Sequence, residues 1–214
     1  PRPKALEEIT LTSAYVNDAH RFAFVGQRFV NDDAWHHVQT FVIFYDTRKH
    51  GDKRWTIHKL EYMTDAGGVK GALVSKPQKE WVFGFINTGY MIIFNEDGEI
   101  TGIENIPIEK DYTRVILTGI DEVESAYGIS TGRNVWKRLE KNKWSFFRKD
   151  FPQINYLSEE NKKISLSYQH GFDAIAGFSD NDIYACGGDG DLWHYNGEIW
   201  EQKEMPTNSS FEHI

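Results

Sequence analysis

The clearest alternation of apolar and polar positions lies in residues 171–206, near the carboxyl end of the sequence. This stretch opens with Phe172–Phe178, a mostly apolar run typical of a strand that is buried on both faces. Three further segments follow, separated by turn-forming Asn, Asp and Gly residues: Ile183–Cys186, Leu192–Tyr195 and Ile199–Lys203. The last of these alternates apolar and polar residues, as an outer strand with one face in solvent does. Four short strands in 36 residues predict one blade of a β-propeller.

A spacing of nine residues separates Tyr184 from Trp193, and it places them on the second and third strands of the predicted blade. Tyr127 and Trp136 repeat both the residue types and the spacing one unit earlier. An earlier pair with the same spacing is Phe83 and Ile92. Self-similarity with a period of roughly 45 residues indicates a chain built from repeated blades.

An apolar residue begins the predicted outer strand of each repeat, namely Trp55, Ile100, Trp144 and Trp200. We therefore expect an all-β fold, a β-propeller of four-stranded antiparallel blades, with about four blades visible in a single domain over 1–214. The blades are expected at about 9–62, 63–109, 110–152 and 170–206.

The segment 207–214 has the pattern of a further inner strand that stops short. Each repeat buries its faces against its neighbours, so a stack of blades has to close into a ring. We therefore predict that 207–214 starts a further blade and that the ring is larger, with a second chain or another segment completing it. The chain begins at Pro1 without Met, so we also expect an amino-terminal piece to be absent.

Two insertions interrupt the repeat, at 31–39 and at 152–170. In a propeller, the loops after the second and the fourth strand of a blade emerge on one face, and insertions in repeats often form the binding face. We therefore expect both insertions to contact a partner, together with the turns near Arg133 and Asp189. The predicted partner-binding residues are Asp32, Asp33, Trp35, His36, His37, Arg133, Tyr156, Glu159, Glu160 and Asp189.

The segment Asp32–His37 is a dense cluster of acidic and His side chains. Adjacent His residues point to opposite sides of an extended segment, and a third metal ligand would have to come from elsewhere. A solvated or partner-contacting loop is therefore the favoured interpretation, with a metal site and a catalytic site as the alternatives. Gly128–Gly132 fits a G-x-S-x-G string but falls in a strand-to-strand turn, not in the strand-to-helix elbow of a hydrolase. We predict no metal, no cofactor and no enzyme active site, and we expect the basic residues of 137–143 on a solvated face.

The net charge of −8 argues against direct binding of nucleic acid, which requires a basic surface. It is compatible with attraction of a basic protein, and also with a role in solubility alone. Cys186 is the only cysteine, so an intramolecular disulfide is excluded, a reducing compartment is favoured and the thiol is expected to be buried. No signal peptide and no apolar stretch of bilayer length are visible, so we expect a cytoplasmic protein without a membrane partner.

The last repeat, 171–206, has the segments YACGG, LWHYNG and IW at its predicted strands and turns. They resemble the blade units of the bacterial β-propeller repeat superfamily, which includes tryptophan–aspartate, kelch and photosystem-assembly-factor-like repeats. The resemblance is fair over 80–152 and only structural over 9–62. It implies a fold and a tendency to bind proteins, and it implies no particular activity.

Two classes of function fit these features. The favoured one is a non-catalytic binder, specifically a bacterial immunity protein that binds and neutralises a basic toxin domain such as a nuclease. The reasons are the acidic balance and the two aromatic-bearing insertions on one face. The alternative is a carbohydrate-binding or carbohydrate-active propeller with a site at the central channel, but the predicted inner strands are mostly aliphatic.

Overall fold

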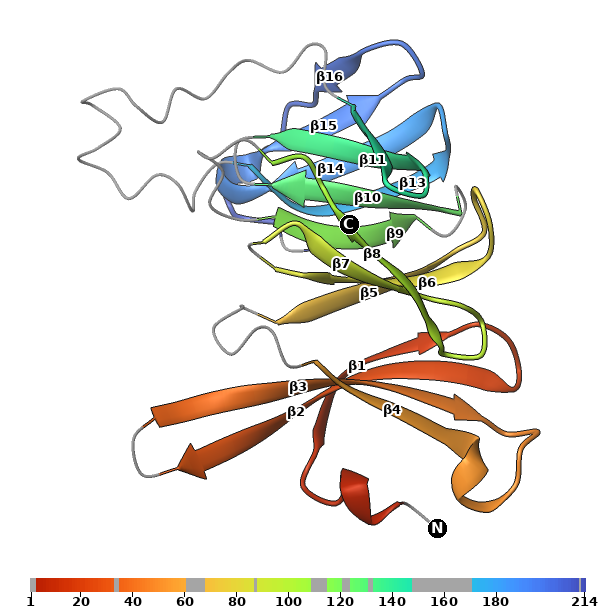
Figure 1. Cartoon of the computed structure of the whole chain (residues 1–214). Coiled ribbons are helices and arrows are strands. Elements are labelled where there is room, and N and C mark those ends of the chain that lie inside the picture. The colour runs from red at the N-terminus through yellow and green to blue at the C-terminus, as the bar shows by residue number, and fades with distance from the viewer. Residues whose placement is uncertain are drawn as a thin grey trace.

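The prediction of an all-β propeller fold is confirmed by a computed structural model, which contains four four-stranded antiparallel sheets (Figure 1). The model describes residues 3–32, 35–60, 68–86, 88–108, 115–120, 124–130, 133–147, 171–211 and 213–214. Among these residues the helices are short 3-10 turns: η1 (Lys4–Leu6), η2 (Gly51–Arg54) and η4 (Gly188–Gly190). None of them is long and apolar enough to span a bilayer.

The strands of each sheet follow one another in chain order, so neighbouring strands are joined as a meander. Sheet 1 consists of β1 (Thr10–Val16), β2 (Arg21–Asp32), β3 (Trp35–Asp46) and β4 (Trp55–Leu60). Sheet 2 consists of β5 (Val69–Val74), β6 (Glu80–Phe85), β7 (Tyr90–Phe94) and β8 (Ile100–Asn105). Sheet 3 consists of β9 (Val115–Ile120), β10 (Ser125–Ser130), β11 (Asn134–Glu140) and β12 (Lys143–Phe146). Sheet 4 consists of β13 (Phe172–Ser179), β14 (Asp182–Gly187), β15 (Leu192–Tyr195) and β16 (Trp200–Gln202).

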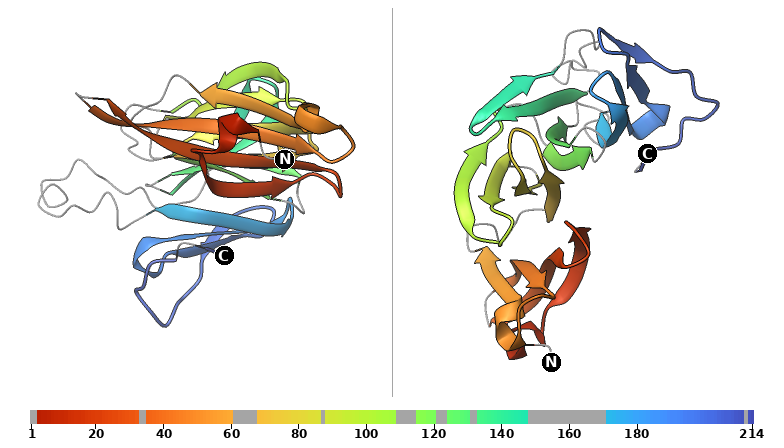
Figure 2. Two further views of the ribbon diagram at one scale, coloured as in Figure 1. Left: turned by 90° about the horizontal axis from the view of Figure 1, so that it is seen from below. Right: turned by 90° about the vertical axis from the view of Figure 1, so that its right-hand side faces the viewer.

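The four sheets are stacked face to face along an arc (Figure 2, right). Their first strands lie on the inside of the arc, where β1 contacts β5, β5 contacts β9 and β9 contacts β13. Sheets 1 and 4 stand at the two ends of an open arc in the part of the chain that the structure describes. Sheets 2 and 3 therefore have neighbours on both faces, whereas sheets 1 and 4 each have one.

The described residues of the carboxyl-terminal tail, 207–211 and 213–214, do not form the expected inner strand. The backbone N–H of Gly190 donates to the carbonyl of Ser209 at 3.1 Å, and the N–H of Phe211 donates to the carbonyl of Gly187 at 2.9 Å. These bonds hold the tail across the turn between β14 and β15.

The alignment of the last two repeats is confirmed by strand register. Trp136 pairs with Gly128 in sheet 3, and Trp193 pairs with Ala185 at the corresponding position of sheet 4. Both Trp side chains are buried, with 2% and 3% of their surface exposed. Each faces the preceding sheet, so the repeat conserves the direction of the side chain as well as its type.

The nine-residue spacing of Phe83 and Ile92 is not equivalent to that of the later pairs. Phe83 and Ile92 are direct cross-strand partners and so lie on one face of sheet 2. Tyr127 instead pairs with Lys137, the neighbour of Trp136, and therefore lies on the face opposite to Trp136. Spacing alone could not reveal this, because it does not say how many residues the connecting turn takes up.

The interfaces between sheets differ in chemistry. Between sheets 1 and 2 the packing is aromatic, with the Phe44 ring edge-on to those of Trp81 and Phe83 at centroid distances of 6.0 and 6.2 Å. Between sheets 3 and 4 it is again aromatic, with the Phe147 ring 4.6 Å from that of Tyr195. Between sheets 2 and 3 an aliphatic core surrounds a buried ion cluster.

Arg138 of β11 is the centre of this cluster, which corrects the expectation that its segment is solvated. Its side chain is fully buried, and its guanidinium donates to both carboxylate oxygens of Glu104 at 2.7 and 3.0 Å and to Glu80 at 2.9 Å. Trp144 Nε1 also donates to Glu104, at 3.1 Å. Burial works to lower the pKa of Arg138, but the hydrogen bonds and charges of Glu104 and Glu80 outweigh it and raise that pKa. A bidentate ion pair thus ties sheets 2 and 3 together.

Replacing Arg138 tests this tie. Arg138→Met leaves two buried carboxylates without their cation, so the free energy of unfolding should fall by about 3–5 kcal/mol. Lys143→Met, which removes an exposed ammonium group from a surface pair with Glu140, should cost less than about 1 kcal/mol. Urea unfolding at neutral pH measures both.

The triple variant Arg138→Met, Glu80→Gln and Glu104→Gln removes the stranded charges and should recover part of the loss. A loss for Arg138→Met no larger than that for Lys143→Met would contradict the assignment of the ion cluster as an inter-sheet tie.

Candidate partner-binding surface

The predicted insertion 31–39 is the end of a long hairpin and not a loop. β2 and β3 are both 12 residues long, and their pairing continues to Asn31–His36 and Asp32–Trp35. Arg28 supports the hairpin at its base, where its guanidinium donates to Gln39 Oε1 at 2.7 Å and lies 5.4 Å from the centre of the Phe41 ring. The end of the hairpin projects past the other sheets on the left of Figure 1. The register pairs Phe29 with Val38 and Val30 with His37, so the strands continue through the segment that the insertion hypothesis took as a loop.

Four of the predicted site residues belong to this hairpin end by their backbone: Asp32, Trp35, His36 and His37. Four others lie outside the described residues: Asp33, Tyr156, Glu159 and Glu160. Partner binding by these eight residues stays a prediction. Among the described side chains, no group of three or more His, Cys, Asp or Glu is placed to hold a metal ion.

Arg133 joins sheet 3 to sheet 4. Its Nε donates to Asp191 Oδ2 at 2.6 Å, and its guanidinium lies 5.3 Å from the centre of the Trp193 ring. Asp191 is buried, and its other oxygen accepts a hydrogen bond from Trp193 Nε1 at 2.8 Å. Sequence reasoning singled out Asp189 in this turn but missed Asp191. The sequence did contain a signal for Asp191, because this residue stands two positions before Trp193, the Trp that is repeated between blades.

Asp189 lies beside this contact in η4 and is exposed. Its φ of 58° is in the left-handed region, which Asp tolerates better than most residues. η4 follows the end of the second strand of its sheet, and the second strands of sheets 1 and 3 end at Asp32 and Ser130. η4 lies on the left side of Figure 1 together with the β2–β3 hairpin end. The structure thus places three of the predicted contact regions on one edge of the arc.

The inside of the arc contains a hollow of about 450 Å³. Its lining comes from β1, β5 and β9: Ala14, Tyr15, Val16, Gly71, Ala72, Leu73 and Thr118. None of these residues is charged, and the Tyr15 hydroxyl already accepts a hydrogen bond from the backbone N–H of Gly71 at 2.8 Å. In the lining that the structure describes, the converging carboxylates and Arg of a sugar-cleaving site are therefore missing.

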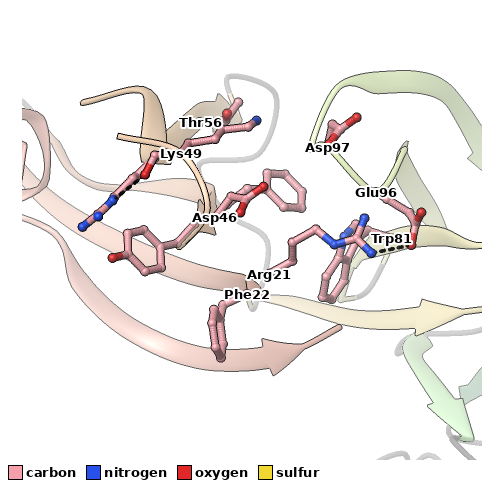
Figure 3. Close-up of a pocket in the computed structure, with 11 residues that line it drawn as sticks. Arg21, Phe22, Asp46, Lys49, Thr56, Trp81, Glu96 and Asp97 are labelled. Atoms are coloured by element: carbon pink, nitrogen blue, oxygen red, sulfur yellow. Dashed lines mark hydrogen bonds and ion pairs between the residues drawn. The ribbon is translucent and has the colours of Figure 1, made fainter. Parts of the chain in front are cut away.

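A second pocket lies between sheets 1 and 2 (Figure 3). Arg21 reaches across it to Glu96 at 3.1 Å, and Lys79 pairs with the same carboxylate at 2.9 Å. The hydrogen bond from Lys79 contributes most to lowering the pKa of Glu96 to about 2, burial opposes it, and Arg21 adds to the lowering. The free volume of about 10 Å³ is close to that of one water molecule, so the pocket is too small for an organic ligand.

The lowered pKa of Glu96 predicts a loss of stability in acid. Its folded-state pKa is below the ordinary value of 4.5, so its stabilising effect is present above that value and disappears as the pH falls toward about 2. Between about pH 5 and pH 2, the wild type should therefore lose more stability than Glu96→Gln does.

Urea midpoints measured across this range check the prediction. Glu99→Gln serves as the control, because it removes a carboxylate from the same turn but outside the ion pairs with Arg21 and Lys79. Parallel curves for the wild type and Glu96→Gln would show that the ion pair does not couple protonation to folding.

Cys186 is buried, as the sequence suggested. Burial, aided by the charge of Asp173, raises the pKa of its thiol to about 11. At neutral pH such a thiol is protonated and serves in packing.

The negative charge of the protein is concentrated in its last sheet and tail. Residues 171–214 contain nine Asp or Glu and one Lys, a net charge of −8 that equals the net charge of the whole chain. The preceding 170 residues are therefore neutral overall. An acidic field of this kind attracts basic partners toward one end of the arc.

Comparison with known proteins gives a partial match in sequence and distant matches in structure. No protein-family model matches the chain. Over 83 residues it is 32% identical to "Immune protein Tsi7" of Pseudomonas aeruginosa. The aligned part is 39% of this chain and spans about a quarter of that relative, 24% of its length.

The solved structure of YCF48 from Cyanidioschyzon merolae has a TM-score of 0.48 and 8% sequence identity. The match covers 88% of this chain and 68% of that one. Similarity of this degree does not support a transfer of function.

Proposed function

We propose that this chain is a non-catalytic, protein-binding propeller that acts as a bacterial immunity protein. It binds a toxin domain with a basic surface in the cytoplasm and blocks its action. The observation that carries the proposal is the 32% identity to the immune protein Tsi7 over 83 residues. Because this match spans only a quarter of Tsi7, the activity and partner of that protein come to this chain only as a proposal.

The features of the described residues support binding rather than catalysis. The hollow inside the arc is lined by uncharged side chains, and the pocket between sheets 1 and 2 has room for about one water molecule. The carboxylates with large pKa shifts, Asp18, Asp46 and Glu96, are all engaged in ion pairs with Arg or Lys side chains. Their pKa shifts are accounted for by ion pairs that stabilise the fold. Recognition of a partner is therefore assigned to the outer surface.

The acidic end of the arc supports a basic partner. Electrostatic attraction between oppositely charged proteins raises the association rate and depends on salt concentration, whereas buried aromatic anchors chiefly slow dissociation. The edge that holds the β2–β3 hairpin end, Arg133 and Asp189 is the proposed contact surface, with Trp35 as its anchor.

Purification of the tagged protein from its native host tests the function. A basic protein should copurify in equal proportion, and its production in a second bacterial host should stop growth unless this chain is produced with it. A partner that forms no stable complex with the purified chain, or whose toxicity the chain does not relieve, would contradict the proposal.

Variants of the hairpin test the contact surface. Trp35→Ala should raise the dissociation rate of the complex by about tenfold or more, because a buried aromatic anchor is worth about 2 kcal/mol. Asp32→Asn should instead slow association and reduce its dependence on salt. Asp97→Asn, an exposed carboxylate in the turn between β7 and β8 at the opposite edge, is the charge-matched control. Surface plasmon resonance gives both rates, and unchanged kinetics for Trp35→Ala would place the partner elsewhere.

A further inference from the structure

Sheet 4 has one face that no other described sheet covers. Its other face, with Ile183, Ala185 and Trp193, packs on sheet 3. The uncovered face is defined by strand register, because directly paired residues lie on the same side of a sheet. Tyr184 pairs with His194, and His194 in turn pairs with Glu201, so these three side chains share it. We call it the outer face of sheet 4, and it also includes Ala174, Ala176, Asp182, Cys186 and Leu192. The carboxyl-terminal tail covers Cys186, whose Sγ lies 3.8 Å from the carbonyl oxygens of Phe211 and His213.

The same position in sheet 3 shows what this face is suited to bind. Tyr127 corresponds to Tyr184, and it is fully buried beneath sheet 4. The ammonium group of Lys137 lies 5.7 Å from the centre of the Tyr127 ring and pairs with Asp180 of sheet 4. A cation held between a Tyr ring and a carboxylate is therefore part of the contact that one sheet makes with the next. In sheet 4 the corresponding Tyr184 is only half-buried.

The outer face has an aromatic centre and an acidic margin. The rings of Tyr184 and His194 are stacked, with centroids 4.3 Å apart and planes inclined by 20°. Asp182 Oδ1 holds the His194 ring at 2.8 Å, and its side chain is 41% exposed. Glu201, 45% exposed, stands on the other side of His194 and pairs with the exposed ammonium group of Lys203 at 3.0 Å. Two accessible carboxylates thus flank a pair of stacked aromatic rings, of which His194 is the more buried, with 17% of its side chain exposed.

The charges of this face determine what can cover it. The face of sheet 2 that packs on sheet 3 carries Glu80 and Glu104, and these buried carboxylates are both paired with Arg138 of sheet 3. Burial of Asp182 and Glu201 likewise costs free energy unless cations are paired with them. Residues 171–214 have a net charge of −8, and Lys203 is their only Lys or Arg. A basic partner supplies the further cations.

We propose that the outer face of sheet 4 is a docking surface for an arginine-rich patch of a basic protein. A guanidinium stacks on the Tyr184–His194 pair, and its N–H groups donate to Asp182 and Glu201. Arginine fits better than lysine because its planar group stacks on aromatic rings and forms several directed hydrogen bonds. The chain contains this arrangement already, in the Arg133 guanidinium over Trp193 with its bond to Asp191. The identification of the partner as a toxin rests on the proposed function, whereas the chemistry of the face does not.

Titration calorimetry with deca-arginine at low salt tests the docking surface. The double variant Asp182→Asn, Glu201→Gln should weaken binding by about tenfold. Glu7→Gln with Glu8→Gln removes the same charge at the far end of the arc and should weaken it by less than about twofold. Equal weakening by the two double variants would reduce the interaction to general charge attraction and overturn the proposal.

The aromatic centre is tested without changing charge. Tyr184→Ser should weaken deca-arginine by about threefold, whereas Tyr184→Phe should bind like the wild type. Deca-lysine should bind more weakly than deca-arginine and be insensitive to Tyr184→Ser. If Tyr184→Ser weakened the binding of both peptides equally, stacking of a guanidinium on the Tyr184 ring would not contribute to binding. Thermal unfolding of each variant checks that sheet 4 is folded, and Tyr184→Phe keeps the test valid if Tyr184→Ser is unstable.

Two further outcomes separate this inference from the proposed function. If the double variant of the face loses deca-arginine binding but still protects cells from the toxin, the face is a basic-protein surface and the toxin binds elsewhere. If the chain protects against no toxin but the face variants behave as expected, the immunity function fails and the docking surface stands. A concentration-dependent dimer in sedimentation that Tyr184→Ser disrupts would assign the face to a second copy and overturn the proposal.

Discussion

Every four-stranded sheet of this protein has two faces to cover, and the stacking of sheets is what covers them. β10 of sheet 3 shows the result, since all six of its residues are buried between sheets 2 and 4. Sheets 1 and 4, at the two ends of the described stack, have a neighbouring sheet on one face only. Sheet 1 covers much of its outward face with the chain's own amino-terminal segment, where Leu6 and Ile9 pack on Phe41 and Ile43. Gly26 makes this possible, because a Cβ there would lie 2.4 Å from Ile9. Sheet 4 has no comparable apolar cap among the described residues.

The repeat determines to which face of a sheet each side chain points. The type of residue at equivalent positions, and with it the chemistry of each interface, differs between sheets. Tyr195 pairs with Trp200 in sheet 4, and Arg138 pairs with Trp144 at the equivalent place in sheet 3. One position thus contributes to an aromatic cluster in one interface and to a buried Glu–Arg–Glu cluster in another. Such exchange explains how blades with little identity can stack, and it lets the last sheet present an acidic face without altering its backbone.

The sequence was sufficient for the fold because the markers lie at positions whose burial is repeated. Trp136 and Trp193 could be aligned from their spacing and strand pattern, and register confirms them. Arg138 could not be recognised, since its burial depends on Glu80 and Glu104, which are distant in sequence and contributed by another sheet. The segment 31–39 was read as an insertion because its polar and His residues hide the strand pairing that the long hairpin maintains.

The candidate surface was harder to predict than the fold. Arg133 was singled out as a partner contact, but the structure places it in an ion pair between sheets, which depends on the approach of Asp191. The acidic outer face of sheet 4 escaped notice because Asp182, Tyr184, His194 and Glu201 come together only through the pairing of three strands. Strand register, rather than composition, brings them to one side.

The central claim is that the outer face of sheet 4 is open to solvent and available to a partner. Hydroxyl-radical footprinting of the full-length protein tests it most directly, with Tyr127 as an internal standard because it is fully buried at the equivalent position of sheet 3. The account predicts that Tyr184, which is partly exposed, is oxidised in the free protein, whereas Tyr127 is spared. Protection of Tyr184 equal to that of Tyr127 would show that another part of the protein already covers this face, and it would contradict the account.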